Sequence, residues 1–150
     1  MGYRKKFRIE GLAQEAPFAK SLKPVLAAHL QRIRKRAEEY LRRPGVEELH
    51  DVRIAIRRFR YVLELYANTM KPGRFRRLYE MLVELQNLLG ERRDIDVILQ
   101  KLGERYAQLH LALPEEVKTS WDSEKESLDQ SIREKLRDFL TDRRIHKLAR

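Results

Sequence analysis

The 150-residue sequence has no cysteine, only five prolines and six glycines, and no apolar run long enough to span a bilayer. The lack of cysteine excludes a disulfide-stabilised fold and any thiolate metal site, and it fits a reducing compartment. The basic N-terminus is not followed by a long apolar stretch, so we see no secretory signal. We therefore expect a cytoplasmic protein that does not span a membrane.

Charge is abundant and unevenly placed. Charged residues make up 37% of the chain and the formal net charge is +10. Residues 1–80 contain 20 Lys or Arg against 9 Asp or Glu, whereas residues 81–150 contain 13 against 14. All of the positive excess thus lies in the first half. This asymmetry favours a polyanionic partner, although a basic surface that serves only solubility gives the same composition.

Apolar residues recur every three or four positions along most of the chain, a spacing that is typical of amphipathic helices. Pro-Gly and Leu-Pro pairs interrupt the pattern, and Gly90 is expected to end or kink a helix. Thr141-Asp142 resembles a fresh helix cap. The predicted main helices cover about 22–43, 47–69, 74–89, 91–111 and 115–140.

No segment alternates with a period of two, so we predict an all-α fold. Short links between helices favour an antiparallel up-and-down bundle of the four-helix type, here with five main helices and a short C-terminal stub. We expect a single domain over residues 1–150. It comprises an N-terminal arm (1–20), the helical bundle (21–140) and the start of a further helix (141–150).

The second predicted helix has two distinct faces. Its apolar arc predicts a core face, formed by Val52, Ile56, Phe59, Leu63 and Tyr66.

A row of basic residues falls on a different arc of the same helix. These residues are His50, Arg53, Arg57 and Arg60, spaced by three, four and three, and Arg58 points elsewhere. Like charges at this spacing repel one another, so the row costs stability unless an anion is bound. Arginine suits such a task because its planar fork donates paired hydrogen bonds to phosphate oxygens. We interpret the row as a candidate anion site, with ordinary solvated surface as the alternative.

The first predicted helix carries a weaker version of this row. His29, Arg32 and Arg36 are spaced by three and four beside its apolar arc. If the two helices pack as antiparallel neighbours, the two rows could line one groove.

Two motifs together resemble the CHAD family, the conserved-histidine α-helical domains. Residues 50–60 read H-x-x-R-x-x-x-R-R-x-R, and residues 89–97 read L-G-E-R-R-D-I-D-V. The resemblance implies an all-α module of two pseudo-symmetric four-helix bundles that binds inorganic polyphosphate in a basic groove and localises to polyphosphate granules. It also implies that His50, Arg53, Arg57 and Arg60 line the groove, with Arg93 as a helper.

The full module of that family is roughly twice as long as this chain, which resembles one half of it. We therefore expect either a fragment or a short member that supplies its second half by forming a homodimer.

Features of an enzyme are lacking in the sequence. Asp94 and Asp96 are the only tempting carboxylate pair, but two residues apart on a helix they point in different directions. We expect Asp94 to stabilise a helix start and to pair with a neighbouring arginine. Four scattered histidines form no metal cluster. We expect no catalytic residues, no metal and no cofactor.

Two other partners remain open. A nucleic acid offers the same phosphates, but the row lacks Asn and Gln for reading bases, and Phe59 and Tyr66 lie on the predicted core arc. Tyr61 lies nearer to the row and leaves this alternative standing. An acidic protein partner is the other possibility. Polyphosphate is the favoured ligand.

Overall fold

The computed structural model describes residues 17–149, which form helices and contain no strand. Its long helices are α1 (Phe18–Arg42), α2 (Val46–Leu65), α3 (Pro72–Gln108) and α5 (Asp122–Thr141). The short helical segments are η1 (Ala67–Thr69), α4 (Glu115–Thr119), α6 (Arg143–His146) and η2 (Lys147–Ala149). The predicted all-α bundle is therefore confirmed.

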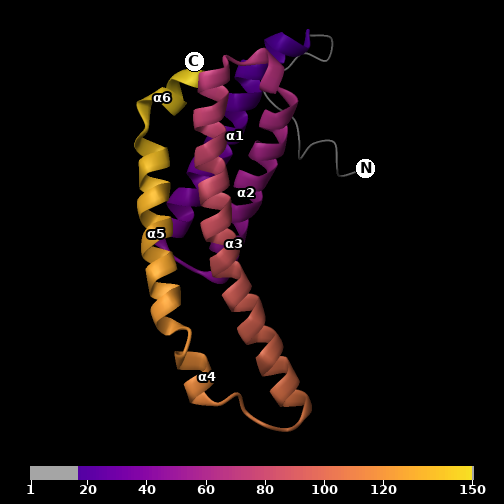
Figure 1. Ribbon diagram of the computed structural model, residues 1–150, viewed down its shortest axis with the longest axis vertical. Helices are drawn as coiled ribbons and strands as arrows, with labels where there is room; N and C mark the ends of the chain where they lie inside the picture. The colour runs from indigo at the N-terminus through magenta and orange to yellow at the C-terminus, as the bar shows by residue number, and fades with distance from the viewer. Residues whose placement is uncertain (1–16, 150) are drawn as a thin grey trace.

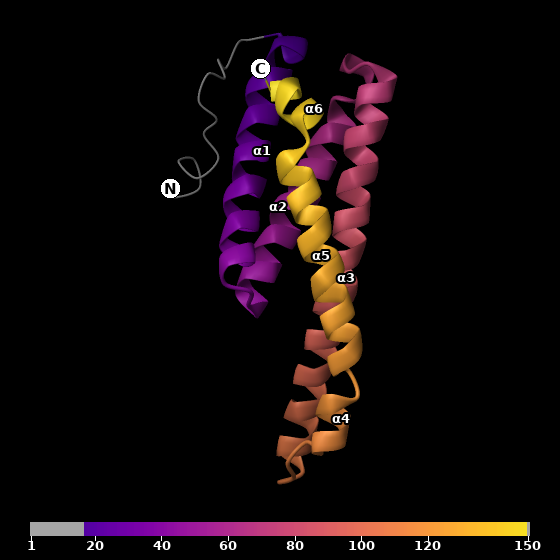
Figure 2. The same ribbon diagram turned by 90° about the vertical axis from the view of Figure 1, so that its left-hand side faces the viewer.

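The four long helices run alternately up and down, as Figures 1 and 2 show. In the upper part of the molecule α2 packs between α1 and α3, and α3 packs between α2 and α5. The C-terminal part of α3, with α4 and the first turns of α5, extends beyond the lower ends of α1 and α2. We call this extension the distal hairpin. The molecule is thus a four-helix bundle at one end and a helical hairpin at the other.

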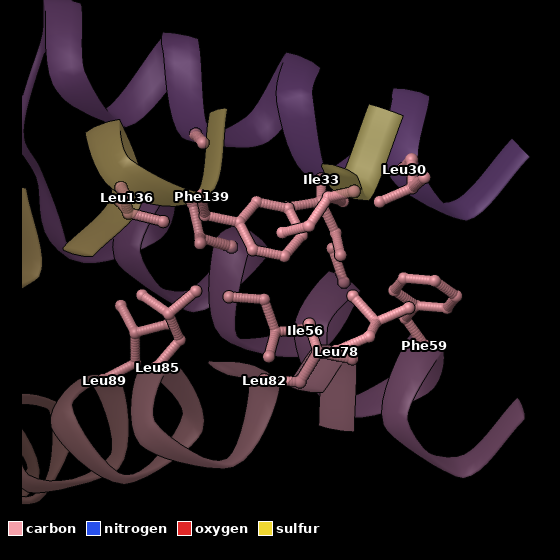
Figure 3. Packing of buried hydrophobic residues seen from close by; sticks show 14 of the residues in the cluster. Leu30, Ile33, Ile56, Phe59, Leu78, Leu82, Leu85, Leu89, Leu136 and Phe139 are labelled. Carbon is pink, nitrogen blue, oxygen red and sulfur yellow. The ribbon is translucent and has the colours of Figure 1, made fainter. Parts of the chain in front are cut away.

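All four long helices contribute to a single apolar core. Figure 3 shows Ile33 from α1, Ile56 and Phe59 from α2, Leu82 from α3 and Phe139 from α5 pointing toward one another. The core arc predicted for α2 is confirmed, because each of its five residues is buried. Truncating a buried leucine in such a core costs about 2–5 kcal/mol.

The predicted break at Gly90 is wrong, since α3 continues through this residue. A glycine inside a helix costs about 1 kcal/mol relative to alanine. Leu89 and Ile95 are buried on either side of it, and their packing outweighs that cost. The helices predicted at 74–89 and 91–111 are therefore one helix.

The end of α3 has a hydrogen-bonded cap. The amide of Leu111 donates to the carbonyl of Tyr106, and the amide of His110 donates to that of Ala107. This pair of bonds forms a Schellman motif, which requires a left-handed residue after the helix. His110 takes that conformation with a φ of 58°.

The start of the first helix also differs from the prediction. The N-terminal arm was predicted to reach residue 20, but α1 begins at Phe18 and contains Pro24; residues 1–16 lie outside the described residues. The Phe18 ring stacks on Tyr66 at 4.4 Å, and Ser21 hydrogen-bonds to the Tyr66 hydroxyl, so these early turns are attached to the region after α2.

The helix predicted at 115–140 is interrupted near Trp121 and forms α4 and α5. The predicted cap at Asp142 is confirmed, because its carboxylate accepts the Arg144 amide at 2.8 Å. Ile98, whose apolar spacing assigned it to the helix predicted at 91–111, is 42% exposed. Among residues 17–149, no helix is both long and apolar enough to cross a membrane.

Candidate anion-binding site

The basic row of α2 lies along the edge of the core. His50, Arg53, Arg57 and Arg60 are all half-buried, whereas Arg58 is exposed. The row thus occupies a different face from Arg58, as the helical wheel predicts. Half-burial holds the guanidinium stems against the bundle and leaves their heads accessible.

The side chains at one end of the row show which seam of the bundle it faces. Glu64, one turn after Arg60, accepts a hydrogen bond from the Tyr79 hydroxyl of α3 at 2.9 Å. The row therefore faces the seam between α2 and α3, which we call the α2–α3 seam.

The same hydrogen bond fixes the register of the two helices. Because α2 and α3 run in opposite directions with the same rise per residue, equal steps away from Glu64 and Tyr79 remain level. Seven, eleven and fourteen steps return to nearly the same helix face. On α2 they reach Arg57, Arg53 and His50, and on α3 they reach Gln86, Gly90 and Arg93. Arg93 is thus level with His50, and its role as a helper stays a prediction.

Several polar atoms along this seam are buried without a partner. Within the described residues, no hydrogen bond reaches His50 Nδ1, Arg53 Nε, Arg60 Nε or Gln86 Oε1. An unpaired buried polar atom typically costs about 1–3 kcal/mol. A fifth such atom, His29 Nδ1, lies outside the seam, so four of the five orphaned atoms line the α2–α3 seam, where a bound ligand would supply partners to the donors.

Gly90 leaves room beside Arg53. A Cβ added at Gly90 would meet no atom of the described chain within 4 Å. Since Gly90 lies level with Arg53, the seam is open at its middle.

The basic row of α1 faces a different seam. Arg36 bonds to Glu39 at 2.9 Å and to Asp51 of α2 at 3.2 Å. Asp51 is nine residues from Arg60, which is two and a half turns, so it lies on the opposite side of α2. The structure therefore does not bring His29, Arg32 and Arg36 into one groove with the row of α2. Their role in binding stays a prediction, and it concerns a separate surface.

His29 is buried rather than presented to a ligand. It is 8% exposed, and its ring stacks on Phe59 with the centroids 5.3 Å apart. Burial, with smaller effects from Arg32 and Arg58, lowers the pKa of His29 to about 4. At neutral pH its imidazole is uncharged and contributes to packing.

The two adjacent arginines of the second motif have different surroundings. Arg92 donates to Asp96 at 2.6 Å and to Asp129 of α5 at 2.8 Å. Tyr40 of α1 donates to the same Asp129 at 3.4 Å, so the cluster connects three helices. Arg93 has a different direction on α3, toward the α2–α3 seam. The motif thus combines a structural arginine, Arg92, with Arg93, whose role in binding stays a prediction.

Comparison with known protein families agrees with this arrangement. A family model described as the CHAD domain matches residues 24–150, which is most of the chain. The chain belongs to the CHAD domain family. No curated protein and no solved structure matches it.

The acidic pair of this CHAD domain is divided between two environments. Asp96 pairs with Arg92, whereas Asp94 is exposed. Asp94 was predicted to lie near a helix start, which is wrong because α3 continues through this region. In the part of the chain that the structure describes, no group of three or more His, Asp or Glu could hold a metal ion.

A hollow of about 610 Å³ lies elsewhere, between α3 and the C-terminal turns. Its charged lining residues are Arg76, Arg77, Arg144, Glu80, Glu84 and Asp142. The three arginines are matched by three carboxylates, so this hollow lacks the positive excess that would attract a polyanion. It is not our candidate site of the CHAD domain.

Some residues of the seam were missed by reasoning from the sequence. Gln86, Gly90 and Tyr79 are on α3, which was read as two helices, so their common face was not recognised. Residues seven, eleven and fourteen positions after Tyr79 share one helix face. This pattern can be recognised in the sequence only if the helix is taken to be continuous.

Proposed function

We propose that this CHAD domain binds inorganic polyphosphate along the α2–α3 seam. The ligand would contact the row of α2, namely His50, Arg53, Arg57 and Arg60, together with Arg93 from α3. Membership of a family associated with polyphosphate binding supports the ligand class. Binding of this kind would also bring the protein to polyphosphate granules.

The observation that carries the proposal is the set of buried donors without partners. Arg53 Nε and Arg60 Nε have no hydrogen-bond partner within residues 17–149. Charge-assisted hydrogen bonds to phosphate are among the stronger polar contacts, so a bound polyanion would satisfy these donors and relieve the repulsion along the row.

Nucleic acid is the second candidate, and Tyr61 is the observation that favours it. Its ring is 51% exposed and lies 4.9 Å from the Arg60 guanidinium carbon, so a base could stack beside the row. Phe59 and Tyr66 are buried and offer no such platform. A single exposed ring supports stacking of few bases, and the phosphate-only ligand remains the better fit.

We extend the proposal to a non-enzymatic role. Hydrolysis of a phosphoanhydride needs carboxylates that converge on a metal, or a nucleophile beside a base. The acidic residues nearest the seam are already paired: Asp96 pairs with Arg92, and Glu64 accepts from Tyr79 within the seam itself. Binding alone accounts for the row of basic residues along the seam.

A competition titration tests the ligand class. Labelled long-chain polyphosphate is bound to the protein at fixed salt and displaced by unlabelled polyphosphate or by single-stranded DNA of equal phosphate concentration. We expect polyphosphate to displace the label more effectively. Affinity should also fall steeply and log-linearly with salt, because each neutralised phosphate releases counterion. Stronger displacement by DNA, or affinity that does not change with salt, would contradict the proposal.

A further inference from the structure

We propose that Glu64, held in place by Tyr79, ends the anion path at the upper end of the α2–α3 seam and so limits the length of phosphate chain that binds well. The proposal rests on the function proposed above and names a residue that opposes binding. It concerns a specificity-determining contact rather than another ligand contact.

The contacts at this end of the seam are specific. Tyr79 donates to Glu64 Oε1 at 2.9 Å, and the same oxygen lies 3.6 Å from Arg60 Nε. The longer separation exceeds hydrogen-bonding distance, so Glu64 partly neutralises Arg60 without satisfying its donor.

Tyr79 is itself restrained. Its ring stacks on Phe75 with the centroids 5.3 Å apart, and Phe75 packs against the core. The hydrogen bond to Glu64 raises the pKa of Tyr79, so its hydroxyl remains a donor at neutral pH. Tyr79 is thus a positioning residue that keeps the carboxylate from closing onto Arg60.

The position of Glu64 has a consequence for chain length. His50 and Arg60, the two ends of the row, are ten residue steps apart on the helix, which corresponds to about 15 Å. A phosphate chain within this span meets only cationic and neutral groups of the row. A longer chain that continues upward along the seam must pass the Glu64 carboxylate, which repels it. Short and long chains should therefore respond differently to removal of this charge.

Calorimetric titrations of four proteins test the proposal: the wild type, Glu64→Gln, Tyr79→Phe and the double variant. Each is titrated with long-chain polyphosphate and with tripolyphosphate at one pH and ionic strength. Glu64→Gln should bind the long chain about two- to fivefold more tightly, as expected for one partly exposed charge contact. The gain for tripolyphosphate should be smaller, because a short chain can bind lower in the seam.

Tyr79→Phe should have the opposite effect. Without its hydroxyl donor, Glu64 can close onto Arg60, so the long chain should bind about two- to fivefold more weakly. The double variant should resemble Glu64→Gln, since Tyr79 then has no carboxylate to hold. A purely structural role of Tyr79 would not produce this dependence on Glu64.

The matched control is Glu80→Gln, which removes the same charge from an exposed position of α3 on the side of the hollow near α6. Equal gains for Glu64→Gln and Glu80→Gln, or no loss for Tyr79→Phe, would overturn this inference while leaving the proposed function intact. If the wild type does not bind polyphosphate, the proposed function fails and this inference fails with it. Melting curves of all variants confirm that each is folded.

Discussion

His29 and His50 both belong to basic rows but differ in their surroundings. His29 is buried against Phe59, and the pKa of its imidazole is lowered to about 4. His50 is half-buried in the α2–α3 seam, level with Arg93. The first histidine therefore contributes to the fold, whereas the second is placed where a ligand can reach it.

The lowered pKa of His29 predicts a loss of stability in acid. Burial keeps His29 neutral in the folded state, whereas the unfolded chain binds the proton below about pH 6.5. The free energy of unfolding should therefore decrease as the pH falls from about 6.5 toward 4. The loss should reach about 3 kcal/mol, from 1.36 kcal/mol per pH unit. Denaturant unfolding at several pH values measures it. His29→Leu should flatten this dependence between pH 6.5 and 4, and an unchanged slope would contradict the assignment.

Arg92 and Arg93 should separate stability from binding. Arg92→Gln leaves Asp96 and Asp129 without their cation and should lower the free energy of unfolding by about 2–4 kcal/mol. Arg93→Gln should change stability by no more than about 0.5 kcal/mol and should weaken polyphosphate binding. Denaturant unfolding and calorimetric titration of the two variants measure both effects. Similar losses of stability in the two variants would argue against the division.

At the level of elements, the continuity of α3 creates the second wall of the seam. Gly90 is the residue at which the helix was predicted to break, and it is also where the seam is open. The lack of a side chain at Gly90 therefore lowers the helix propensity of α3, and it also keeps the seam open for a ligand.

The effect of Gly90 on stability and its effect on binding can be measured with two different substitutions. Gly90→Ala should raise the free energy of unfolding by about 0.5–1 kcal/mol, because a methyl group there meets no described atom and improves helix propensity. Gly90→Leu should fill the seam beside Arg53 and weaken polyphosphate binding in titrations. If Gly90→Leu binds as tightly as Gly90→Ala, the ligand does not occupy the middle of the seam.

The helical elements were largely readable from sequence because amphipathic periodicity depends on local spacing. The core face of α2 and the cap at Asp142 followed from that spacing alone. The break at Gly90 was misjudged because propensity is a weak local term that the burial of Leu89 and Ile95 overrides.

The site was less predictable than the helices. A helical wheel shows which residues share a face but not which neighbouring helix that face meets. The row of α2 was therefore identified, whereas Arg36 of the α1 row faces a different side of α2, and binding by His29, Arg32 and Arg36 stays a prediction. Arg36 pairs with Asp51 across the α1–α2 seam, a tertiary contact that no spacing within one helix reveals.

At the scale of the whole molecule, the distal hairpin exposes apolar side chains. Ile98, Leu109 and Leu111 are 42%, 64% and 58% exposed. The homodimer predicted from the sequence stays a prediction, and these residues are where we would disrupt it. Light scattering at micromolar concentration should give a dimer mass that Leu109→Glu with Leu111→Glu converts to a monomer mass. A monomer mass for the wild type would contradict the predicted homodimer.

Charge is the other property of the whole molecule, since the net charge of +10 alone attracts polyanions. The central claim is that the α2–α3 seam, rather than this overall charge, binds polyphosphate. Arg53, Arg57 and Arg60 are the arginines of the row, whereas Arg74, Arg76 and Arg77 are exposed on the first turns of α3. Replacing either set with Gln removes the same charge, so the second triple variant is a control for the first.

The most direct measurement is a calorimetric titration of long-chain polyphosphate into the wild type and both triple variants at one salt concentration, with melting curves to confirm folding. We expect both variants to fold, and the variant of the row should be slightly stabilised because like-charge repulsion is removed. Its affinity should fall by orders of magnitude, since several charge-assisted contacts are lost together, whereas the control should bind only slightly more weakly. Equal losses in the two variants, or unfolding of the variant of the row, would contradict a binding site in the α2–α3 seam.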